Sequence, residues 1–235
     1  DSLGTASISS LTAEQIASLN TAGIAGLTTA QVASLTSVQI AALTSTQIGA
    51  LTSTQVAVLQ SDDFAAMSTS DIAALSSSAV AGISTAVLAT LPTEQIAALN
   101  STALPGLTTA QIATLSTTQI ASLTTSQASA LTSRQISVTA SQVAALSSRQ
   151  IAAIETQDLD TFSTADFAAI SANGIAGLST TVIATLTNDQ VAALGTAAIA
   201  ALSTTQLAVL TSAQFNALTT PQIAAASRNS RTIWS

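Results

Sequence analysis

Few side chains in this 235-residue chain could take part in catalysis. The chain has eleven Asp and Glu, four Arg, and no Lys, His, Cys or Tyr. Nucleophilic triads, imidazole acid–base catalysis, Schiff bases and the usual zinc sites each need a residue type that is absent. Carboxylates are therefore the only groups that could act as acids, bases or metal ligands.

The carboxylates gather in two clusters, and the chemistry that such clusters suggest is calcium binding. One cluster has Asp62, Asp63 and Asp71, and the other has Asp158, Asp160 and Asp166. Neighbouring units could bring these oxygens together around a Ca²⁺ ion. Sugar hydrolysis by paired carboxylates would need a cleft and aromatic platforms, and the chain has only four Phe and one Trp. The elements that position the clusters decide between these roles.

Those elements are eight-residue units. A large apolar residue recurs at every eighth position from Leu3 to Leu131, one step of seven leads to Val138, and steps of eight then continue to Leu218. A second apolar residue lies five positions after each of these. We call the two sets the Leu column and the Ile column. Such a short fixed period indicates a stacked repeat array.

Each unit has the signals of a helix start. In the unit that begins at Leu35, Thr36 is followed three residues later by Gln39, which is the capping-box pattern. Leu35 before the cap and Ile40 at the fourth helical position form a hydrophobic staple. Ile40 and Leu43 are one helical turn apart, so they share a face of a helix. A helix that restarts this often is too short to be stable alone and must stack on its neighbours.

We therefore predict an all-α solenoid of very short helices, with one helix per unit. Residues 1–226 would form a single domain with a register shift at 132–138. A coil could hold two helices or three, and a β-solenoid and one long continuous helix remain alternatives. We expect the Ala that follows the Ile column, such as Ala41, to lie between neighbouring helices, so that Leu at this position would be destabilising.

The helices give the carboxylates a structural role. Four Asp share the position of Gln39, where a carboxylate completes the capping box and interacts favourably with the helix dipole. These are Asp63, Asp71, Asp158 and Asp166. We favour capping over calcium binding, and we predict a protein that is not an enzyme, without catalytic, cofactor-binding or metal-binding residues.

Glycine and proline mark local departures from the repeat. The pairs Gly23/Gly26 and Gly174/Gly177 could let a ligand approach the backbone, but we favour helix termination or tight packing between helices. Pro105 lies inside a unit and should distort it.

The C-terminal residues 227–235 leave the repeat and include the sole Trp, Trp234. This tail could dock into a neighbouring copy, fold back on its own chain or stay disordered. Because the chain starts at Asp1, we expect a processed product or a part of a longer protein.

The composition favours self-association. A net charge of −7 with no Lys excludes nucleic acid as a partner. A surface of Ser, Thr and Gln repels its own kind only weakly, so a homopolymer is the expected assembly, with other cell-surface components as further partners. There is no run of about 18 apolar residues, so no membrane-spanning segment is expected. The absence of Cys excludes disulfides.

The unit L-T-T-x-Q-I/V-A-A-L resembles the octad arrays of large secreted or surface proteins of proteobacteria, which are adhesin-like or filamentous. This resemblance covers nearly the whole chain and implies an extracellular or cell-surface role without catalysis. The shorter pattern L-T-x-x-Q-I/V also resembles the start of each repeat in the transcription-activator-like DNA-binding effectors. Their repeats are much longer and carry basic residues and base-reading loops, so their DNA binding is not carried over.

The predicted function is therefore structural. The ends of a solenoid expose an apolar coil, and matching ends can propagate as a fibre. The chain would be a subunit of an extracellular filament, sheath or surface layer assembled by solenoid stacking. The alternative is the stalk or ligand-binding segment of a secreted bacterial adhesin, which would need aromatic or charged residues grouped on one face.

Overall fold

The computed structural model describes residues 4–136 and 139–230, and the regular structure in them is all helical. These residues contain 27 α-helices and one 3₁₀ helix, without a strand. They fall into two compact units, residues 1–115 and 116–235. The predicted α-solenoid of very short helices is confirmed, and neither the β-solenoid nor the continuous helix is found in the described residues.

The described α-helices have four to six residues each, except α27 with eleven, and η1 has three. Unit 1 contains α1 (Thr5–Ser9), α2 (Ala13–Ala17), α3 (Thr21–Ala25), α4 (Thr29–Ala33), α5 (Ser37–Ala41), α6 (Ser45–Gly49), α7 (Ser53–Val56), α8 (Ser61–Ala66), α9 (Thr69–Ala74), α10 (Ser77–Val80), α11 (Thr85–Thr90), α12 (Thr93–Ala98), η1 (Leu104–Gly106) and α13 (Thr109–Thr114). Unit 2 contains α14 (Thr117–Ser122), α15 (Thr125–Ala130), α16 (Ser133–Ile136), α17 (Ala140–Ala145), α18 (Ser148–Ala153), α19 (Thr156–Leu159), α20 (Thr164–Ala169), α21 (Ala172–Ile175), α22 (Thr180–Thr185), α23 (Asn188–Ala193), α24 (Thr196–Ala201), α25 (Thr204–Ala208), α26 (Ser212–Asn216) and α27 (Thr220–Ser230).

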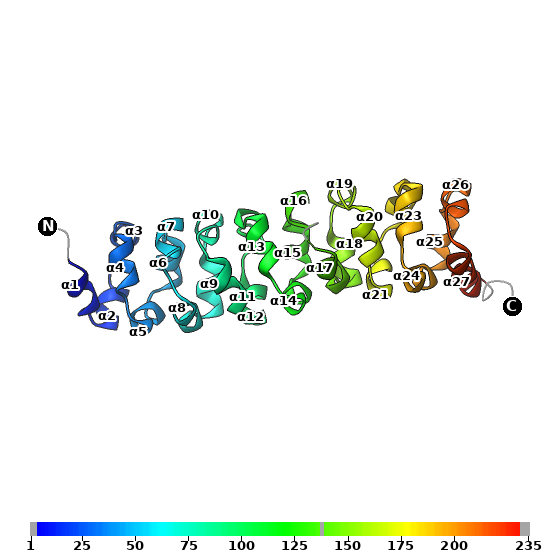
Figure 1. Ribbon diagram of the computed structural model, residues 1–235. Helices are drawn as coiled ribbons and strands as arrows, with labels where there is room; N and C mark the ends of the chain where they lie inside the picture. Colours follow the sequence, from blue (N-terminus) through cyan, green and yellow to red (C-terminus); the bar gives the residue numbers. More distant parts are fainter. Residues whose placement is uncertain (1–3, 137–138, 231–235) are drawn as a thin grey trace. The chain divides into compact units, whose positions relative to one another are not determined.

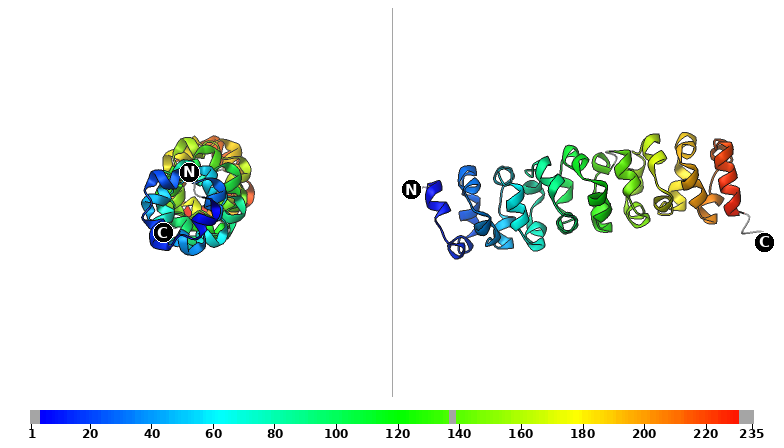
Figure 2. Two further views of the ribbon diagram at one scale, coloured as in Figure 1. Left: turned by 90° about the vertical axis from the view of Figure 1, so that its left-hand side faces the viewer. Right: turned by 60° about the horizontal axis from the view of Figure 1, so that its bottom comes forward.

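Three helices make one coil of the solenoid. Within each unit, helices pack against the third helix along the chain, as α2 does against α5, α5 against α8, and α21 against α24. In unit 1, Figure 1 shows α2, α5 and α8 following one another along one edge, while α7 and α10 follow one another along the opposite edge. For unit 1, the right-hand view of Figure 2 shows the same succession of coils from another direction. The sequence left the number of helices per coil open, and the structure decides it.

The Leu and Ile columns form the core of each unit. Ile16 and Ile48 are fully buried, and Leu51 and Leu59 are 3 % and 2 % exposed. Full burial of one such side chain stabilises the fold by about 1.5–3 kcal/mol. This contribution recurs twice in each octad, which is why helices of less than two turns remain folded here although they would melt in isolation.

The predicted position of the Ala after the Ile column is wrong. Ala33, Ala41 and Ala57 are exposed, not packed between helices. Ile and the next Leu already occupy the inward arc of the helix, and the residue after Ile projects about 100° further round, toward solvent. The position just before the Leu column, held by Ala42 in the same octad, is half-buried and is where successive coils meet.

Glycine at this coil contact marks the closest approach of two backbones. A Cβ atom on Gly82 would lie 2.0 Å from the Ser53 carbonyl oxygen, and one on Gly177 would lie 2.1 Å from the Ser148 oxygen. Gly106 has the same relation to Ser77. Tight packing is thus confirmed for Gly177.

The other glycines that the sequence singled out are not all in such contacts. A Cβ on Gly174 would meet the Ile151 side chain at 2.8 Å, so this glycine is also tightly packed. A Cβ on Gly26 would meet only the carbonyls of Ala22 and Gly23 in the preceding helix, at 3.1 and 3.7 Å, as expected at a helix end. None of these contacts involves a site for a ligand.

Pro105 distorts its octad, as predicted. The α-helix expected after Leu99 is replaced by a turn and by η1. Pro lacks a backbone N–H, and its fixed φ suits the first residues of a tight helical turn. Leu104 and Leu107 nevertheless stay in the core, with 1 % and 4 % exposed. The 3₁₀ turn therefore keeps the apolar columns in place.

Candidate assembly interface

The repeated polar contact of this fold begins as a helix cap. In the octad of α6, the Thr44 backbone N–H donates to Gln47 Oε1 at 2.7 Å, and the Gln47 N–H donates to Thr44 Oγ1 at 3.3 Å. The same reciprocal pair is present in most of the described helices, for example in α2, α13 and α26. The capping box predicted from the sequence is confirmed.

The same Gln side chain also joins one coil to the next. Gln47 Nε2 donates to the carbonyl oxygens of Ile16 at 2.9 Å and Leu19 at 2.7 Å, in the preceding coil. Gln39 makes the equivalent bonds to Ile8 and Leu11, at 3.0 and 2.8 Å. The oxygen of the amide thus caps its own helix, while the nitrogen donates to the neighbouring coil.

This joint recurs in both units. Gln55, Gln95 and Gln111 in unit 1, and Gln206 and Gln214 in unit 2, each donate to a carbonyl of the Ile column and one of the Leu column. The hydrogen bonds from the Gln amide to the neighbouring coil were not predicted from the sequence. The available signal was the choice of Gln over Glu, because Glu can also complete a capping box but has no N–H to donate.

The missing residue between Leu131 and Val138 leaves this joint intact. Gln150 Nε2 donates to the carbonyls of Ile120 at 2.9 Å and Leu123 at 2.8 Å. These acceptors lie 30 and 27 residues back in the sequence, whereas those of Gln47 lie 31 and 28 back. The stacking of unit 2 therefore continues past the deletion. Val138 itself lies outside the described residues.

Where Asp71 takes the place of Gln, the hydrogen bond between coils has its donor and acceptor exchanged. The carboxylate accepts, and the neighbouring coil donates. Asp71 Oδ2 accepts from the Ser68 backbone N–H at 3.0 Å, which completes the cap. Its Oδ1 accepts a hydrogen bond of 2.9 Å from the hydroxyl of Ser45, in the coil below. Asp63 and Asp166 accept from their own N-cap residues in the same way, at 2.9 and 2.8 Å. The predicted capping role of these three carboxylates is confirmed.

No metal centre is assembled from the acidic residues that the structure describes. Within residues 4–136 and 139–230, no three or more His, Cys, Asp or Glu side chains are grouped so that they could hold a metal ion. Asp62 and Asp160 are exposed. Glu14 is also exposed, and its backbone N–H and the Thr12 hydroxyl hold the pKa of its carboxyl below the usual value.

One octad carries an incomplete joint. Pro92 is the N-cap of α12 and has no N–H, so Gln95 Oε1 is buried without a hydrogen-bond partner. Gln95 Nε2 still donates to the carbonyls of Phe64 and Met67, at 2.8 and 3.1 Å. A buried acceptor without a partner is destabilising.

Replacing Pro92 by Thr should therefore stabilise the protein. Thr supplies the N–H that Gln95 Oε1 lacks and adds a capping hydroxyl, so the free energy of unfolding should rise by about 1–2 kcal/mol after the gain in flexibility of the unfolded chain is subtracted. The control is Pro221→Thr, because in that octad the Thr219 N–H already donates to Gln222 Oε1 at 2.7 Å. Urea denaturation measures both. A P92T protein no more stable than the parent would contradict this account of the orphaned oxygen.

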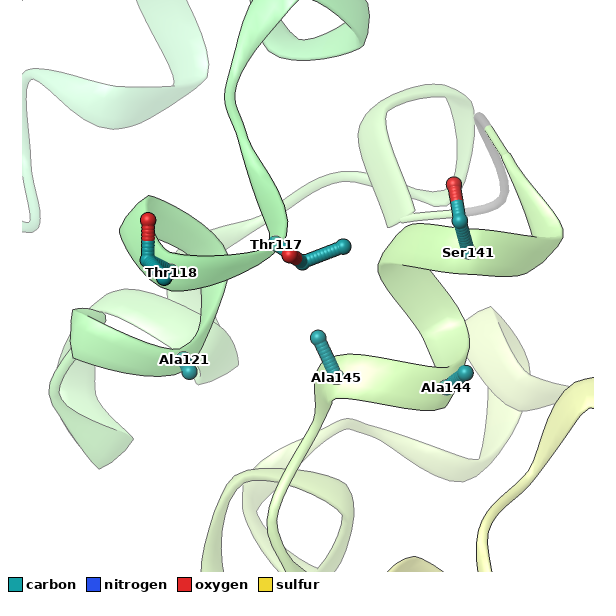
Figure 3. Close-up of a pocket in the computed structure, with 6 residues that line it drawn as sticks. All are labelled: Thr117, Thr118, Ala121, Ser141, Ala144 and Ala145. Carbon is teal, nitrogen blue, oxygen red and sulfur yellow. The ribbon is translucent and has the colours of Figure 1, made fainter.

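A surface pocket of about 390 Å³ lies between α14 and α17. Thr117, Thr118 and Ala121 line it from α14, and Ser141, Ala144 and Ala145 line it from α17. Figure 3 shows Thr117 and Ala145 pointing into the space between the two helices. The lining offers only methyl and hydroxyl groups and no ionisable or aromatic side chain, so it has no chemistry for catalysis and little for specific recognition.

The first coil leaves its Leu column partly uncovered. Ile8, Ile16 and Ile24 are at most 1 % exposed, but Leu11, Leu19 and Leu27 are only half-buried. In the next coil, the equivalent Leu43 is 4 % exposed because the first coil covers it. The Leu column therefore faces the preceding coil. We call the surface of Leu11, Gln15, Leu19 and Leu27 the N-face.

The last coil leaves its Ile column uncovered instead. Phe215 is 43 % exposed, and Leu207 and Ile223 are half-buried. Val191, one coil earlier than Phe215, is fully buried. A hollow of about 130 Å³ on this surface is lined by Leu207, Phe215, Ala226 and Ser227. We call the surface of Leu207, Leu210, Phe215 and Ile223 the C-face.

Comparison with known proteins identifies the repeat. The sequence profile of the ALTTAQ repeat matches residues 21–53, 29–61, 56–93, 151–188 and 191–225, which together make up more than half of the chain. The chain belongs to the ALTTAQ repeat family. No curated protein and no solved structure matches it.

In this chain, the ALTTAQ motif is the joint between coils. Residues 217–222 read A-L-T-T-P-Q and residues 106–111 read G-L-T-T-A-Q. The first position is the small residue where coils meet, and the second is the buried Leu column. The third is the N-cap Thr, and the sixth is the Gln that caps its helix and donates to the coil below. The ALTTAQ repeat is thus a stacking unit.

The C-terminal part of the chain starts as helix. Ser227–Ser230, which the sequence placed in a non-repeat tail, continue the last ALTTAQ helix, α27. Trp234 lies outside the described residues, so its predicted docking stays a prediction. No helix within residues 4–136 or 139–230 has the length and apolar character needed to cross a membrane.

Proposed function

We propose that this ALTTAQ repeat chain is a non-enzymatic structural protein, a subunit of an extracellular filament, sheath or surface layer in which copies stack end to end. The N-face of one copy would cover the C-face of the next. Because these faces differ, the contact is heterologous and can continue without closing.

The observation that carries the proposal is the complementarity of the two faces. Inside each unit, every coil buries its Leu column on the coil before it and its Ile column on the coil after it. The N-face presents the first of these surfaces, and the C-face presents the second. A second copy therefore offers each face the same kind of partner that covers the internal coils.

The chemistry of the surface supports association between copies. The described surface is mostly Ser, Thr and Ala, because most Gln side chains are buried between coils, and the net charge of −7 is spread over 235 residues. Such a surface is well hydrated but offers weak repulsion between copies. It also offers no cluster of basic groups for nucleic acid or anionic lipid.

The described residues favour this role over that of the ligand-binding segment of an adhesin. Phe64, Phe162 and Phe167 are at most 3 % exposed, so they cannot serve as platforms for a ligand. The fourth Phe, Phe215, lies on the C-face. An adhesin stalk would share the fold but would not need copies to stack.

The C-face can be tested with one substitution. Phe215→Glu places a charge where a second copy would bury an aromatic ring, so the concentration needed for assembly should rise more than tenfold. Electron microscopy and sedimentation velocity of the full chain measure this. The helical signal in circular dichroism should persist, because Phe215 is not part of the internal core.

Val38→Glu is the matched control. Val38 is the other large apolar residue that is exposed among the described residues, at 71 %, and it lies on α5, away from both faces. The V38E protein carries the same added charge as F215E and should assemble like the parent. If the parent stays monomeric at high concentration, or if F215E and V38E impair assembly equally, end-to-end stacking is not the mode of association.

A further inference from the structure

Gln15 on the N-face makes the capping hydrogen bond of an internal Gln but not the bonds to a neighbouring coil. The Thr12 backbone N–H donates to Gln15 Oε1 at 2.8 Å, as Thr44 N–H does to Gln47 Oε1. The amide is therefore held in the orientation that internal Gln side chains use. Gln15 is exposed, and its Nε2 makes no hydrogen bond to any residue that the structure describes.

The C-face has the matching acceptors. Inside the units, Gln Nε2 donates to carbonyls of the Leu column, such as Leu11 and Leu19. The Leu210 and Leu218 carbonyls occupy the same positions in the last coil, just after the ends of α25 and α26. They accept no hydrogen bond from a residue that the structure describes.

Resting on the proposed end-to-end stacking, we infer that Gln15 sets the polarity and register of the joint between copies. Its Nε2 donates to a Leu-column carbonyl in the last coil of a second copy. The bond forms only head to tail, because the N-face supplies a donor and no Leu-column acceptor, whereas the C-face supplies acceptors. A slip of one residue along the octad would place the amide opposite side chains instead.

The apolar parts of the two faces fit this register. In the internal joint of Gln47, Ile16 and Leu19 supply the carbonyls, while the Ile16 side chain is buried in the core and the half-buried Leu19 side chain lies on the N-face. In the joint between copies, the half-buried Leu11 and Leu19 would face the Ile column of the C-face. The hollow beside Phe215, of about 130 Å³, has room for one aliphatic side chain. Apolar contact supplies attraction, and Gln15 selects the register.

The test exchanges two neighbouring residues, Glu14→Gln with Gln15→Glu, in the full chain. The net charge stays the same, and Glu at position 15 can still accept from Thr12 N–H, so the cap of α2 is kept. The donor is lost, and a carboxylate would face carbonyl oxygens. We expect the critical concentration for assembly to rise about tenfold, with the melting temperature of the unassembled protein unchanged.

The outcomes separate this inference from the proposed function. If the parent chain does not assemble at all, the stacking proposal fails, and this inference fails with it. If the parent assembles and the exchanged variant assembles at the same concentration, Gln15 does not set the joint while stacking itself stands. Glu14→Gln alone is the control, and it should assemble at least as readily as the parent.

Discussion

Gln47→Glu is expected to destabilise unit 1 by about 2–4 kcal/mol at neutral pH. Glu has nearly the same shape and can still cap α6, so only the joint to the preceding coil is lost. The two donor bonds to Ile16 and Leu19 disappear, and a carboxylate only 3 % exposed faces two carbonyl oxygens. Urea denaturation followed by circular dichroism gives the change in the free energy of unfolding.

The stability of the Q47E protein should also depend on pH. Burial among carbonyl oxygens should raise the pKa of a carboxyl at position 47 above its unfolded value of about 4.3. The folded state then binds more protons than the unfolded state, so the loss of stability grows as the pH rises through 4.3. The Q47E protein should lie closer to the parent at pH 4 than at pH 7.

Gln15→Glu is the matched control for the cap. It has the same helix position and the same hydrogen bond to the N-cap, but no coil below it. The change in stability of the unassembled chain should stay below about 0.5 kcal/mol. If Q47E and Q15E destabilise equally, the hydrogen bonds between coils contribute nothing, and the Gln would matter only as a cap.

Gly82→Ala should destabilise unit 1 by about 2 kcal/mol or more. The added methyl would sit 2.0 Å from the Ser53 carbonyl oxygen, and a backbone atom cannot move aside as a flexible side chain can. The coils around α7 and α10 must separate to admit it. This outweighs the gain of about 0.4–1 kcal/mol that Gly→Ala gives by restricting the unfolded chain. Thermal and urea denaturation measure the balance.

Two controls isolate the close approach. Gly195→Ala adds the same methyl where the nearest atom is 3.9 Å away, so it should cost no more than the roughly 1 kcal/mol or less expected from placing Ala at the N-cap of α24. Ala41→Leu adds a larger group at an exposed position and should change stability by less than about 0.5 kcal/mol. A tolerated G82A, or a severe A41L, would mean that the assignment of the two small-residue positions is reversed.

The helix starts could be predicted from the sequence because the contacts that form them are local. Thr36, Gln39 and Ile40 lie within five residues, and the hydrogen bonds and staple that they form need no other part of the chain. The same holds for the caps at Asp71 and Asp166, and for the turn that Pro105 imposes. These features were predictable because each depends on a spacing of three or four residues.

The coil contacts were not predictable in the same way. Both residues after Ile40 are Ala, and composition alone cannot tell the exposed Ala41 from the half-buried Ala42. The wrong prediction for Ala41 came from assigning the small residues to the contact before the direction of the next coil was known. Likewise, the Gln47 amide nitrogen finds its acceptors 31 and 28 residues away, beyond any local pattern.

By itself, the sequence determined an eight-residue period, one short helix per period, an aliphatic core, and the absence of the residue types that most catalysis needs. These follow from composition and from contacts within one octad. The tertiary structure alone decided that three helices complete a coil, that Gln joins coils, and that the first coil leaves its Leu column partly uncovered while the last coil leaves its Ile column uncovered. The physical reason is that the turn between helices is fixed by cap geometry and by packing summed over a whole coil, so each octad acquires its partners only when its neighbours are in place.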